Sequence, residues 1–264
     1  MKILVVGDPH GKLGKIKKLD LKEIEMILIT GDLGESDSAR KFYFGNLERK
    51  RKGLPELEET QKLIKEIWNS SYVSSMAVIK YLAKFAPVYT MMGNVTSKDA
   101  YARADEKKFG IKLPRLIHDI NKTKNTQVVK NQLRIINGLR VGFLEYFLED
   151  SWVKEFKEKD KKIIQKAKKE TEKARRVLRK FGKVDVLICH QPPYGILDKV
   201  NSLFAPKNWN GGHAGSKVIL DYIKKYQPEY VFCGHIHEGK GMKKIGKTKV
   251  YNVGHEGDYA LIDI

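Results

Sequence analysis

The sequence predicts an α/β fold, and the main observation is a set of five short, continuous apolar runs. Such runs are typical of strands that are buried on both faces, and helical stretches separate several of them. Each run is followed directly by polar residues. The 264 residues contain no internal repeat and no linker rich in Pro, Gly and Ser. We therefore expect one domain over residues 1–264, with helical insertions at about 36–86 and 151–183.

The first two predicted strands end in the same way. Lys2–Val6 is followed by Gly and then by Asp8 and His10, and the run Glu25–Thr30 is followed by Gly and Asp32. The carboxyl edge of a parallel sheet is where open α/β folds keep their sites. Two carboxylates at the same topological point therefore indicate a functional edge rather than two incidental turns.

The next segment is predicted to be mainly helical. Residues 36–55 are polar and basic, and a helical pattern follows from Leu57 to Phe85, where Asn69, Ser70 and Ser71 suggest a break into two helices. Pro87 then opens the strand Val88–Met92, which Gly93 and Asn94 follow.

The middle of the chain has a different pattern. After a basic helical stretch at 97–116, three short strands are predicted around Gln127–Lys130, Leu133–Ile136 and Arg140–Leu144. Asn137 and Gly138 lie between the last two strands and are a strong hairpin signal. We therefore expect this region to be antiparallel.

Residues 151–181 are strongly basic and predict one long helix or two shorter ones that end at Gly182. The net charge of the chain is +19, and residues 151–183 carry 14 Lys and Arg against 5 Asp and Glu. A basic patch of this kind attracts polyanions such as nucleic acid or acidic lipid. The alternative is an ordinary solvated face on a lysine-rich protein.

The last two buried runs also deliver histidines. Val184–Cys189 leads to His190, and Pro192 and Pro193 then exclude a continuing central strand. A Gly-rich loop containing His213 follows. Ser216 is predicted to cap a helix over 217–226.

The final deep strand, Glu229–Cys233, runs into Gly234-His235-Ile236-His237. Two imidazoles one residue apart on a turn form a poor core and a good metal clamp. The tail segments Lys249–Val253 and Tyr259–Ile264 predict an antiparallel close.

Composition restricts the class of protein. Cys189 and Cys233 are expected to be reduced, buried thiols. No basic-then-apolar leader is found, and no apolar run approaches the roughly 18 residues of a membrane span. We expect a cytoplasmic protein with no membrane partner. Its Lys and Glu richness, with six Gln, resembles thermophile composition.

The residues that follow the strands form a candidate metal site. These are Asp8, His10, Asp32, Asn94, His190, His235 and His237. Seven ligands exceed the needs of one metal but suit two ions that share a carboxylate, such as Mn, Fe, Zn, Ni or Co. Two such cations stabilise both the attacking and the leaving oxygen at phosphorus. The predicted chemistry is metal-assisted hydrolysis of a phosphoester.

This arrangement resembles the calcineurin-like metallophosphoesterases. The motifs that carry the resemblance are Asp8-Pro9-His10, Gly31-Asp32, Gly93-Asn94, His190 and Gly234-His235-Ile236-His237. The resemblance implies a four-layer α/β/β/α sandwich. It also implies one metal held by Asp8, His10 and His237, a second held by Asn94, His190 and His235, and Asp32 as the bridge. A hydroxide held between the two ions would be the nucleophile.

Two positions depart from the family's pattern. Many members have His followed by Asp or Glu after the Gly-Asn, where this chain has Val95 and Thr96, and Glu35 replaces the second acid of Gly-Asp-x-x-Asp. In the family that His usually protonates the leaving group or stabilises the transition state, and valine can do neither. Members without it resemble phosphodiesterases more often than monoesterases, which favours diesters. His213 and His255 lie on Gly-rich loops and are candidates to face the substrate, or are ordinary surface histidines, as is expected of His118.

Three functional hypotheses follow. The first is a binuclear phosphoesterase that acts on a phosphoester substrate, with a preference for diesters. A sharper variant is a nuclease or nucleotide phosphodiesterase whose basic helix at 151–181 binds nucleic acid. The third is a catalytically weak scaffold that keeps the fold. The sequence does not specify an oligomeric state.

Overall fold

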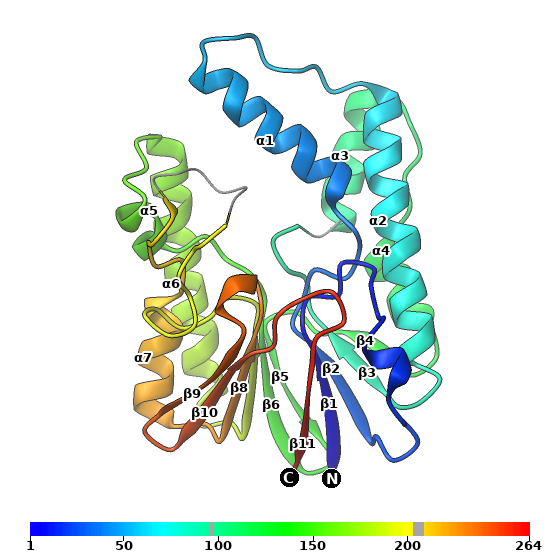
Figure 1. The fold of residues 1–264 in the computed structure, drawn as a ribbon, viewed down its shortest axis with the longest axis vertical. Helices are drawn as coiled ribbons and strands as arrows, with labels where there is room; N and C mark the ends of the chain where they lie inside the picture. Colours follow the sequence, from blue (N-terminus) through cyan, green and yellow to red (C-terminus); the bar gives the residue numbers. More distant parts are fainter. Residues whose placement is uncertain (96–97, 203–208) are drawn as a thin grey trace.

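In the computed structural model two β-sheets pack face to face, and helices cover the outer face of each sheet (Figure 1). The four layers follow the order α/β/β/α, as the family resemblance implies. The structure describes residues 1–95, 98–202 and 209–264.

The first sheet has the strand order β11-β1-β2-β3-β4. The strands are β1 (Lys2–Val6), β2 (Met26–Ile29), β3 (Val88–Thr90), β4 (Thr126–Val128) and β11 (Tyr259–Asp263). Strands β1 to β4 are parallel, and β11 pairs antiparallel with β1. Because Val6 pairs with Ile29 and Ile29 pairs with Thr90, the parallel strands end level with one another. The segments that carry Asp8, Asp32 and Asn94 therefore leave the sheet at one edge.

The second sheet has the order β5-β6-β7-β8-β10-β9. The strands are β5 (Gln132–Ile136), β6 (Leu139–Leu144), β7 (Val186–Cys189), β8 (Tyr230–Cys233), β9 (Gly241–Ile245) and β10 (Thr248–Asn252). The predicted hairpin at Asn137 and Gly138 is present, with both residues at positive φ.

The expectation of an antiparallel middle is only partly correct. The β5–β6 hairpin is antiparallel, but β4 pairs parallel with β3, and β6 pairs parallel with β7. In the tail, β10 is parallel to β8 and antiparallel to β9, a strand that the sequence did not predict. Strand direction depends on non-local pairing, which a local pattern of apolar residues does not specify.

One buried core lies between the two sheets. Ile3, Val5 and Leu28 of the first sheet pack in the same cluster as Phe143 and Phe232 of the second. Because both sheets bury apolar side chains in this shared layer, neither inner face is covered without the other. We propose on this basis that the chain folds as one domain.

Most of the helices form the two outer layers. The helices are α1 (Asp37–Arg51), α2 (Gln61–Leu82), α3 (Asp99–Phe109), α4 (Leu116–Lys122), α5 (Asp150–Glu155), α6 (Lys161–Phe181) and α7 (Lys217–Tyr226), with 3₁₀ turns at Ile16–Lys18 and His237–Gly239. Residues of α2 and α4 pack on the first sheet, and residues of α6 and α7 pack on the second. None of the helices in the described residues is long and apolar enough to cross a membrane.

Helix α2 is continuous, so the predicted break at residues 69–71 is wrong. The serine hydroxyls donate to carbonyl oxygens of the preceding turn, as Ser74 does to Ser70 at 2.7 Å and Ser75 does to Ser71 at 2.7 Å. These bonds keep the polar side chains within the helix. The small serines also allow the Gly34 backbone to pack closely against the helix.

The basic stretch forms two helices rather than one. Helix α5 ends at Glu155, and Asp160 caps α6 by accepting a hydrogen bond from the Lys162 amide at 2.7 Å. Gly182, at φ 60°, ends α6 as predicted. Similarly, Ser216 caps α7 by accepting from the Ile219 amide at 3.0 Å. Both cysteines are free and buried, as the sequence predicts.

The close approach of Gly34 to α2 gives a testable prediction. A Cβ on Gly34 would collide with the Ser71 carbonyl oxygen and lie 2.5 Å from Ser75 Oγ. Because the collision is partly with backbone, we expect Gly34→Ala to lower the free energy of unfolding by about 1–3 kcal/mol, measured by denaturant titration. Gly14→Ala is the control, because a Cβ there meets no atom within 4 Å. Equal stability of the two variants would contradict this account of the packing.

Candidate metal centre

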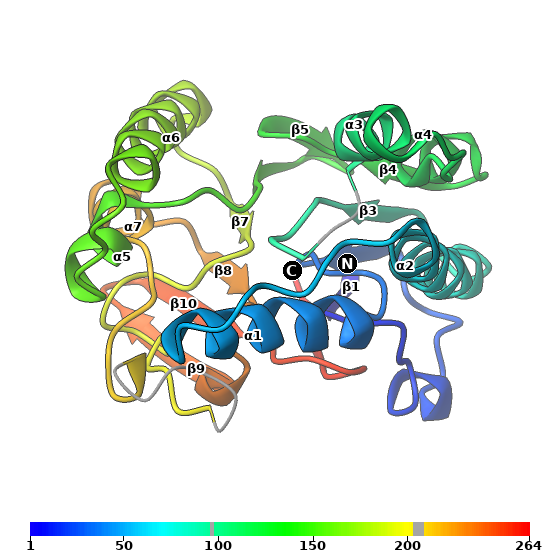
Figure 2. The same cartoon turned by 90° about the horizontal axis from the view of Figure 1, so that it is seen from above.

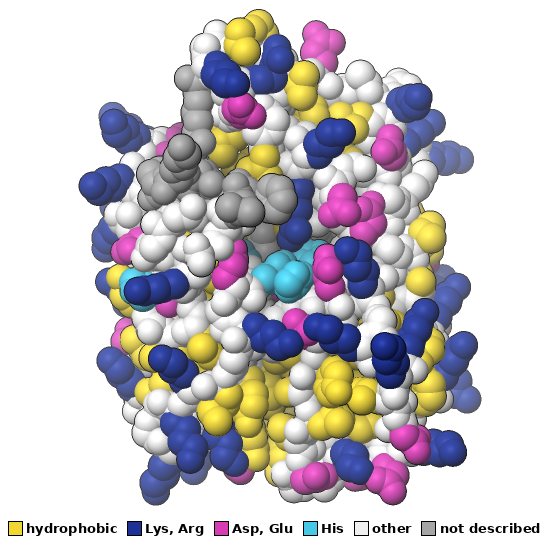
Figure 3. All heavy atoms as spheres, viewed as in Figure 1, with side chains coloured by type: hydrophobic (Ala, Val, Ile, Leu, Met, Phe, Trp, Pro, Cys, Tyr) yellow, Lys and Arg dark blue, Asp and Glu magenta, His cyan; other side chains and the backbone are white. Residues whose placement is uncertain are grey.

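The structure brings all seven candidate residues into one cluster at the carboxyl ends of the parallel strands. They come from the loops that follow β1, β2, β3, β7 and β8. Histidine side chains are visible near the middle of the face shown in Figure 3, with cationic side chains close by. Asp8, Asp32 and His190 are almost fully buried beneath them.

One half of the cluster consists of Asp8, His10 and His237. His237 Nε2 lies 3.5 Å from Asp8 Oδ2, and the rings of His10 and His237 meet edge to face with their centroids 5.2 Å apart. Each of the three residues offers a ligand atom within 4.8 Å of the others. This geometry is suited to holding one metal ion.

The other half consists of Asp32, Asn94, His190 and His235. Asn94 Oδ1 lies 2.7 Å from His190 Nε2 and 2.9 Å from His235 Nδ1. His190 Nε2 is also 3.6 Å from Asp32 Oδ2. Asp8, Asp32 and His190 form a second group with ligand atoms within 4.8 Å of one another.

Hydrogen bonds from the surrounding backbone and from Thr30 orient these ligand atoms. Asp8 accepts from the Thr30 hydroxyl at 2.7 Å and from the His235 amide at 2.6 Å, and Asp32 accepts from the Val95 amide at 3.0 Å. His190 Nδ1 lies 3.1 Å from the Thr30 carbonyl, which can only accept, so the proton belongs on Nδ1. A single proton on Nδ1 leaves the lone pair on Nε2, which faces the cluster.

The turns that carry the ligands are strained. His10, Asp32 and His235 have φ angles of 43°, 32° and 67°, a left-handed conformation that side chains rarely adopt. Such residues cost about 1–3 kcal/mol each and are concentrated at functional sites. This conformational strain is what directs each of these side chains into the cluster.

Two of the glycines in the motifs are required by space. A Cβ on Gly93 would collide with the Asp32 carboxylate and approach His190 Cε1 to 2.6 Å. A Cβ on Gly234 would lie 2.5 Å from Asp8 Oδ1. The backbone therefore passes directly against the ligand side chains, and only glycine leaves room for them.

The charges of the cluster affect one another strongly. Burial alone would raise the pKa of Asp8, but the neighbouring His190, His237 and His10 hold the pKa of its carboxyl well below the usual value. Burial lowers the pKa of His10, and burial together with His190 lowers the pKa of His235. Asp8 is thus an anion and these two imidazoles are neutral at neutral pH, which are the forms that bind metals.

Two residues at the site were missed by the sequence reasoning. Arg40 of α1 donates from Nη2 to His10 Nε2 at 3.3 Å. The ring of Tyr146, just after β6, lies 5.9 Å from that of His190 and 5.4 Å from that of His235. Neither belongs to a motif with recognisable spacing. The only local signal was that Tyr146 closely follows a buried apolar strand, as the ligands do.

The two candidate substrate-facing histidines have different surroundings. The ring of His255 stacks on His237 with centroids 4.2 Å apart, beside the cluster. His213 lies 2.8 Å through Nδ1 from Asp198 Oδ1 and packs against Tyr194. That either one faces the substrate stays a prediction. The third, His118, is exposed on α4.

The positions that depart from the family's pattern serve local roles. Val95 donates its amide to Asp32, whereas Thr96 lies outside the described residues. Glu35 accepts from the Asp37 amide at 3.0 Å at the start of α1. Its carboxylate therefore caps a helix.

The fold and the cluster together define an α/β/β/α protein with a site of carboxylates, imidazoles and one amide. Residues 1–239 match the calcineurin-like phosphoesterase family. The chain therefore belongs to this family, whose members are generally dinuclear metal-dependent enzymes.

Two curated relatives come from Caenorhabditis elegans. UPF0046 protein T07D4.2 is 40% identical over 70 residues, which are 26% of this chain and 16% of that protein. UPF0046 protein K07C11.7 is 35% identical over 68 residues, which are 26% of this chain and 20% of that protein. The matched segment thus spans a fifth or less of the length of these relatives.

Two solved structures are similar to this chain over almost its whole length. One superposes with a TM-score of 0.64 at 19% identity, covering 99% of this chain and 94% of its own, which shows a shared fold. The other is described as a novel archaeal phosphodiesterase, with a TM-score of 0.36 at 12% identity, covering 99% of each chain.

The bond from Thr30 to Asp8 gives a prediction about metal affinity. Thr30→Val removes the hydroxyl that donates to Asp8 Oδ1, so we expect metal affinity to fall by roughly 10- to 100-fold. Calorimetric titration with Mn²⁺ measures this. Thr90→Val is the control, because Thr90 is equally buried but, within the part of the chain that the structure describes, its hydroxyl bonds only to the Met91 carbonyl at 3.4 Å. Unchanged affinity in Thr30→Val would show that this bond does not orient a ligand.

Proposed function

We propose that this protein is a metal-dependent phosphoesterase that hydrolyses phosphodiesters at a centre of two divalent ions. The observation that carries the proposal is the convergence of seven ligand-type side chains, from five loops, in one cluster at the sheet edge. Asp8, His10 and His237 would hold one ion, and Asn94, His190 and His235 the other. Asp32 would contact both.

The donor atoms fit such ions. The lone pair of His190 Nε2 lies 2.7 Å from Asn94 Oδ1, which is also an acceptor. A cation bound by both atoms would relieve the repulsion between the two acceptors. Nitrogen and oxygen donors of this kind suit Mn, Fe, Zn, Ni or Co.

The protein's own part in the reaction is orientation. When bound, the two ions supply Lewis-acid activation of water and stabilise charge on the phosphoryl oxygens. Thr30 and the His235 amide fix the Asp8 carboxylate, and the Val95 amide fixes Asp32. Because these donors are held by the fold before substrate arrives, the site does not need to reorganise during the reaction.

The preference for diesters rests on Val95. Hydrolysis of a phosphomonoester dianion passes through a loose transition state in which negative charge builds up on the departing alkoxide oxygen. A proton donor would neutralise this charge, and valine has no proton to give. A diester with an acidic leaving group requires less protonation. This is the physical reason for placing phosphodiesters first.

A metal-by-substrate screen tests the proposal. Purified protein would be loaded with Mn²⁺, Zn²⁺, Ni²⁺, Co²⁺ or Fe²⁺ and assayed with bis-p-nitrophenyl phosphate and p-nitrophenyl phosphate. We expect faster turnover of the diester with at least one metal. Activity on the monoester alone would overturn the diester preference, and absence of bound metal after reconstitution would favour a scaffold without catalysis.

A matched pair of histidine variants tests the site itself. His237→Asn should reduce the bound metal, measured by elemental analysis, and lower kcat/KM by roughly 10²-fold or more. His118→Asn changes an exposed histidine on α4 and should leave both quantities unchanged.

A second candidate function is a nuclease or nucleotide phosphodiesterase. Helix α6 has one buried face, and on it Ala174, Leu178 and Phe181 pack against the second sheet. Its sequence otherwise contains ten Lys and Arg against two Glu, and most of these cations are exposed. A surface of this charge favours the backbone of a nucleic acid.

Salt dependence tests this second candidate. Glutamine would replace four exposed lysines of α6, namely Lys161, Lys162, Lys168 and Lys169. If these lysines neutralise phosphates, affinity for an oligonucleotide should fall, and the slope of log affinity against log salt should decrease by about 0.7–0.9 for each phosphate that is no longer neutralised. The charge-matched control replaces Lys22, Lys124, Lys243 and Lys244 with glutamine. Affinity that does not change with salt would remove the nucleic-acid candidate.

A further inference from the structure

Tyr146 stands at the His190–His235 half of the cluster. Its amide donates to the Met92 carbonyl at 3.4 Å, which places it beside the chain leading to Asn94 and Val95. Its ring meets His190 nearly at right angles and His235 at 50°. None of the described residues forms a hydrogen bond with its hydroxyl.

Arg40 stands at the other half, where it donates to His10. A guanidinium beside imidazoles that are expected to bind cations is unfavourable by itself. An anionic group between Arg40 and the cluster removes this repulsion, and a phosphoryl group has the required charge and geometry.

Helix α1 holds Arg40 in this place. The helix crosses above the carboxyl ends of the strands of both sheets (Figures 1 and 2). Glu35 caps its start at the Asp37 amide. Since α1 buries little of its own surface, its orientation depends on what anchors the far end.

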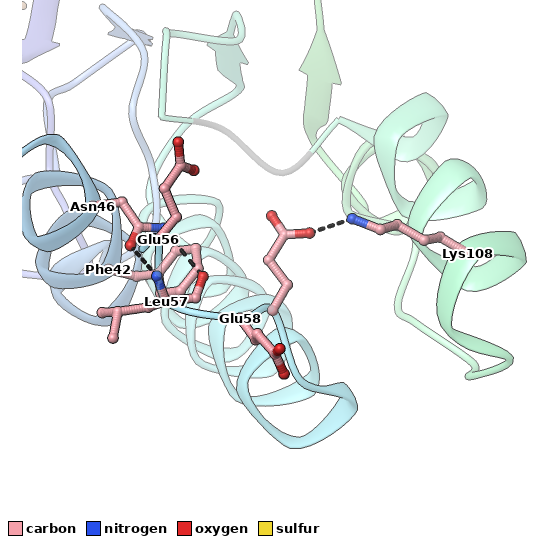
Figure 4. A pocket seen from close by; sticks show the side chains of 7 residues that line it. Phe42, Asn46, Glu56, Leu57, Glu58 and Lys108 are labelled. Carbon is pink, nitrogen blue, oxygen red and sulfur yellow. Dashed lines mark hydrogen bonds and ion pairs between the residues drawn. The ribbon is translucent and has the colours of Figure 1, made fainter. Parts of the chain in front are cut away.

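That far end borders a cavity of about 500 Å³ between α1, the segment after it and α3 (Figure 4). Asn46 holds the Leu57 backbone by two hydrogen bonds, accepting from its amide at 2.6 Å and donating to its carbonyl at 3.4 Å. Lys108 of α3 pairs with Glu59. The Asn46–Leu57 bonds therefore hold the far half of α1 against the segment that follows it, and the Lys108–Glu59 pair holds that segment against α3.

From this geometry we propose that Arg40 binds the phosphoryl oxygens of the substrate and that the Tyr146 hydroxyl donates a hydrogen bond to the leaving-group oxygen. The inference rests on the proposed phosphoesterase function and deepens it. A tyrosine that donates while keeping its proton stabilises developing charge without transferring the proton. Because no proton is transferred, the leaving group must depart as an anion. Phosphodiesters with acidic leaving groups are therefore the favoured substrates, which agrees with valine at position 95.

Paired variants test the two roles. Tyr146→Phe keeps the ring against the histidines and removes only the hydroxyl. Across a series of aryl phosphodiesters, we expect kcat to fall by roughly 10- to 100-fold for the least acidic leaving group and less for p-nitrophenolate, with KM nearly unchanged. Tyr89→Phe is the control, because Tyr89 is half-buried in β3 and its ring packs on Phe143.

Arg40 is tested by binding as well as by activity. Arg40→Met should weaken calorimetric binding of inorganic phosphate to the metal-loaded protein by about tenfold or more, and Arg40→Lys should recover part of the loss. Metal content should equal that of the unchanged protein in all variants.

Three outcomes would overturn the inference. They are wild-type kcat for every leaving group in Tyr146→Phe, wild-type phosphate affinity in Arg40→Met, and loss of metal from either variant, which would indicate a structural role. If the unchanged protein hydrolyses no phosphoester with any metal, the proposed function fails separately. Phosphate affinity in the same variants then decides whether Arg40 binds the anion, and unchanged affinity refutes it.

Discussion

The burial of the Asp8 carboxylate is the constraint on which the rest of the structure depends. Its side chain has no exposed surface, and an unpaired charge in that position costs several kcal/mol. Asp8 is stabilised by Thr30 of the neighbouring strand segment, by the His235 amide, and by His190 and His237 from the second sheet. These partners come from both sheets, so the charge is tolerated only when the sheets are correctly packed against each other.

The same constraint explains why the loops of the site are unfavourable for stability. Three ligand-type residues adopt left-handed backbone conformations, and Gly93 and Gly234 leave no room for a Cβ. These features are stable only because the shared core between the sheets fixes the strand ends. Directing these side chains to one point therefore lowers the stability of the fold, as is common at functional sites.

Charge links the site to the rest of the surface. The chain carries a net charge of +19, yet two of its buried carboxylates, Asp8 and Asp32, lie together at the edge of the sheet. A positive surface raises the local concentration of anions, and the carboxylates concentrate cations at the point where those anions would react. Arg40 adds to the positive charge of the surface and also contacts the cluster through His10.

The sequence by itself determined the buried strands and the residues that follow them. This was possible because a strand buried on both faces must be continuously apolar, and polar residues directly after it must emerge at the sheet edge. All seven candidate ligands were found in this way. Tertiary structure alone decided the direction of β4 and the continuity of α2, and it placed Arg40 and Tyr146 at the cluster. Strand direction and these approaches depend on packing between segments distant in the chain, which no local spacing of residues encodes.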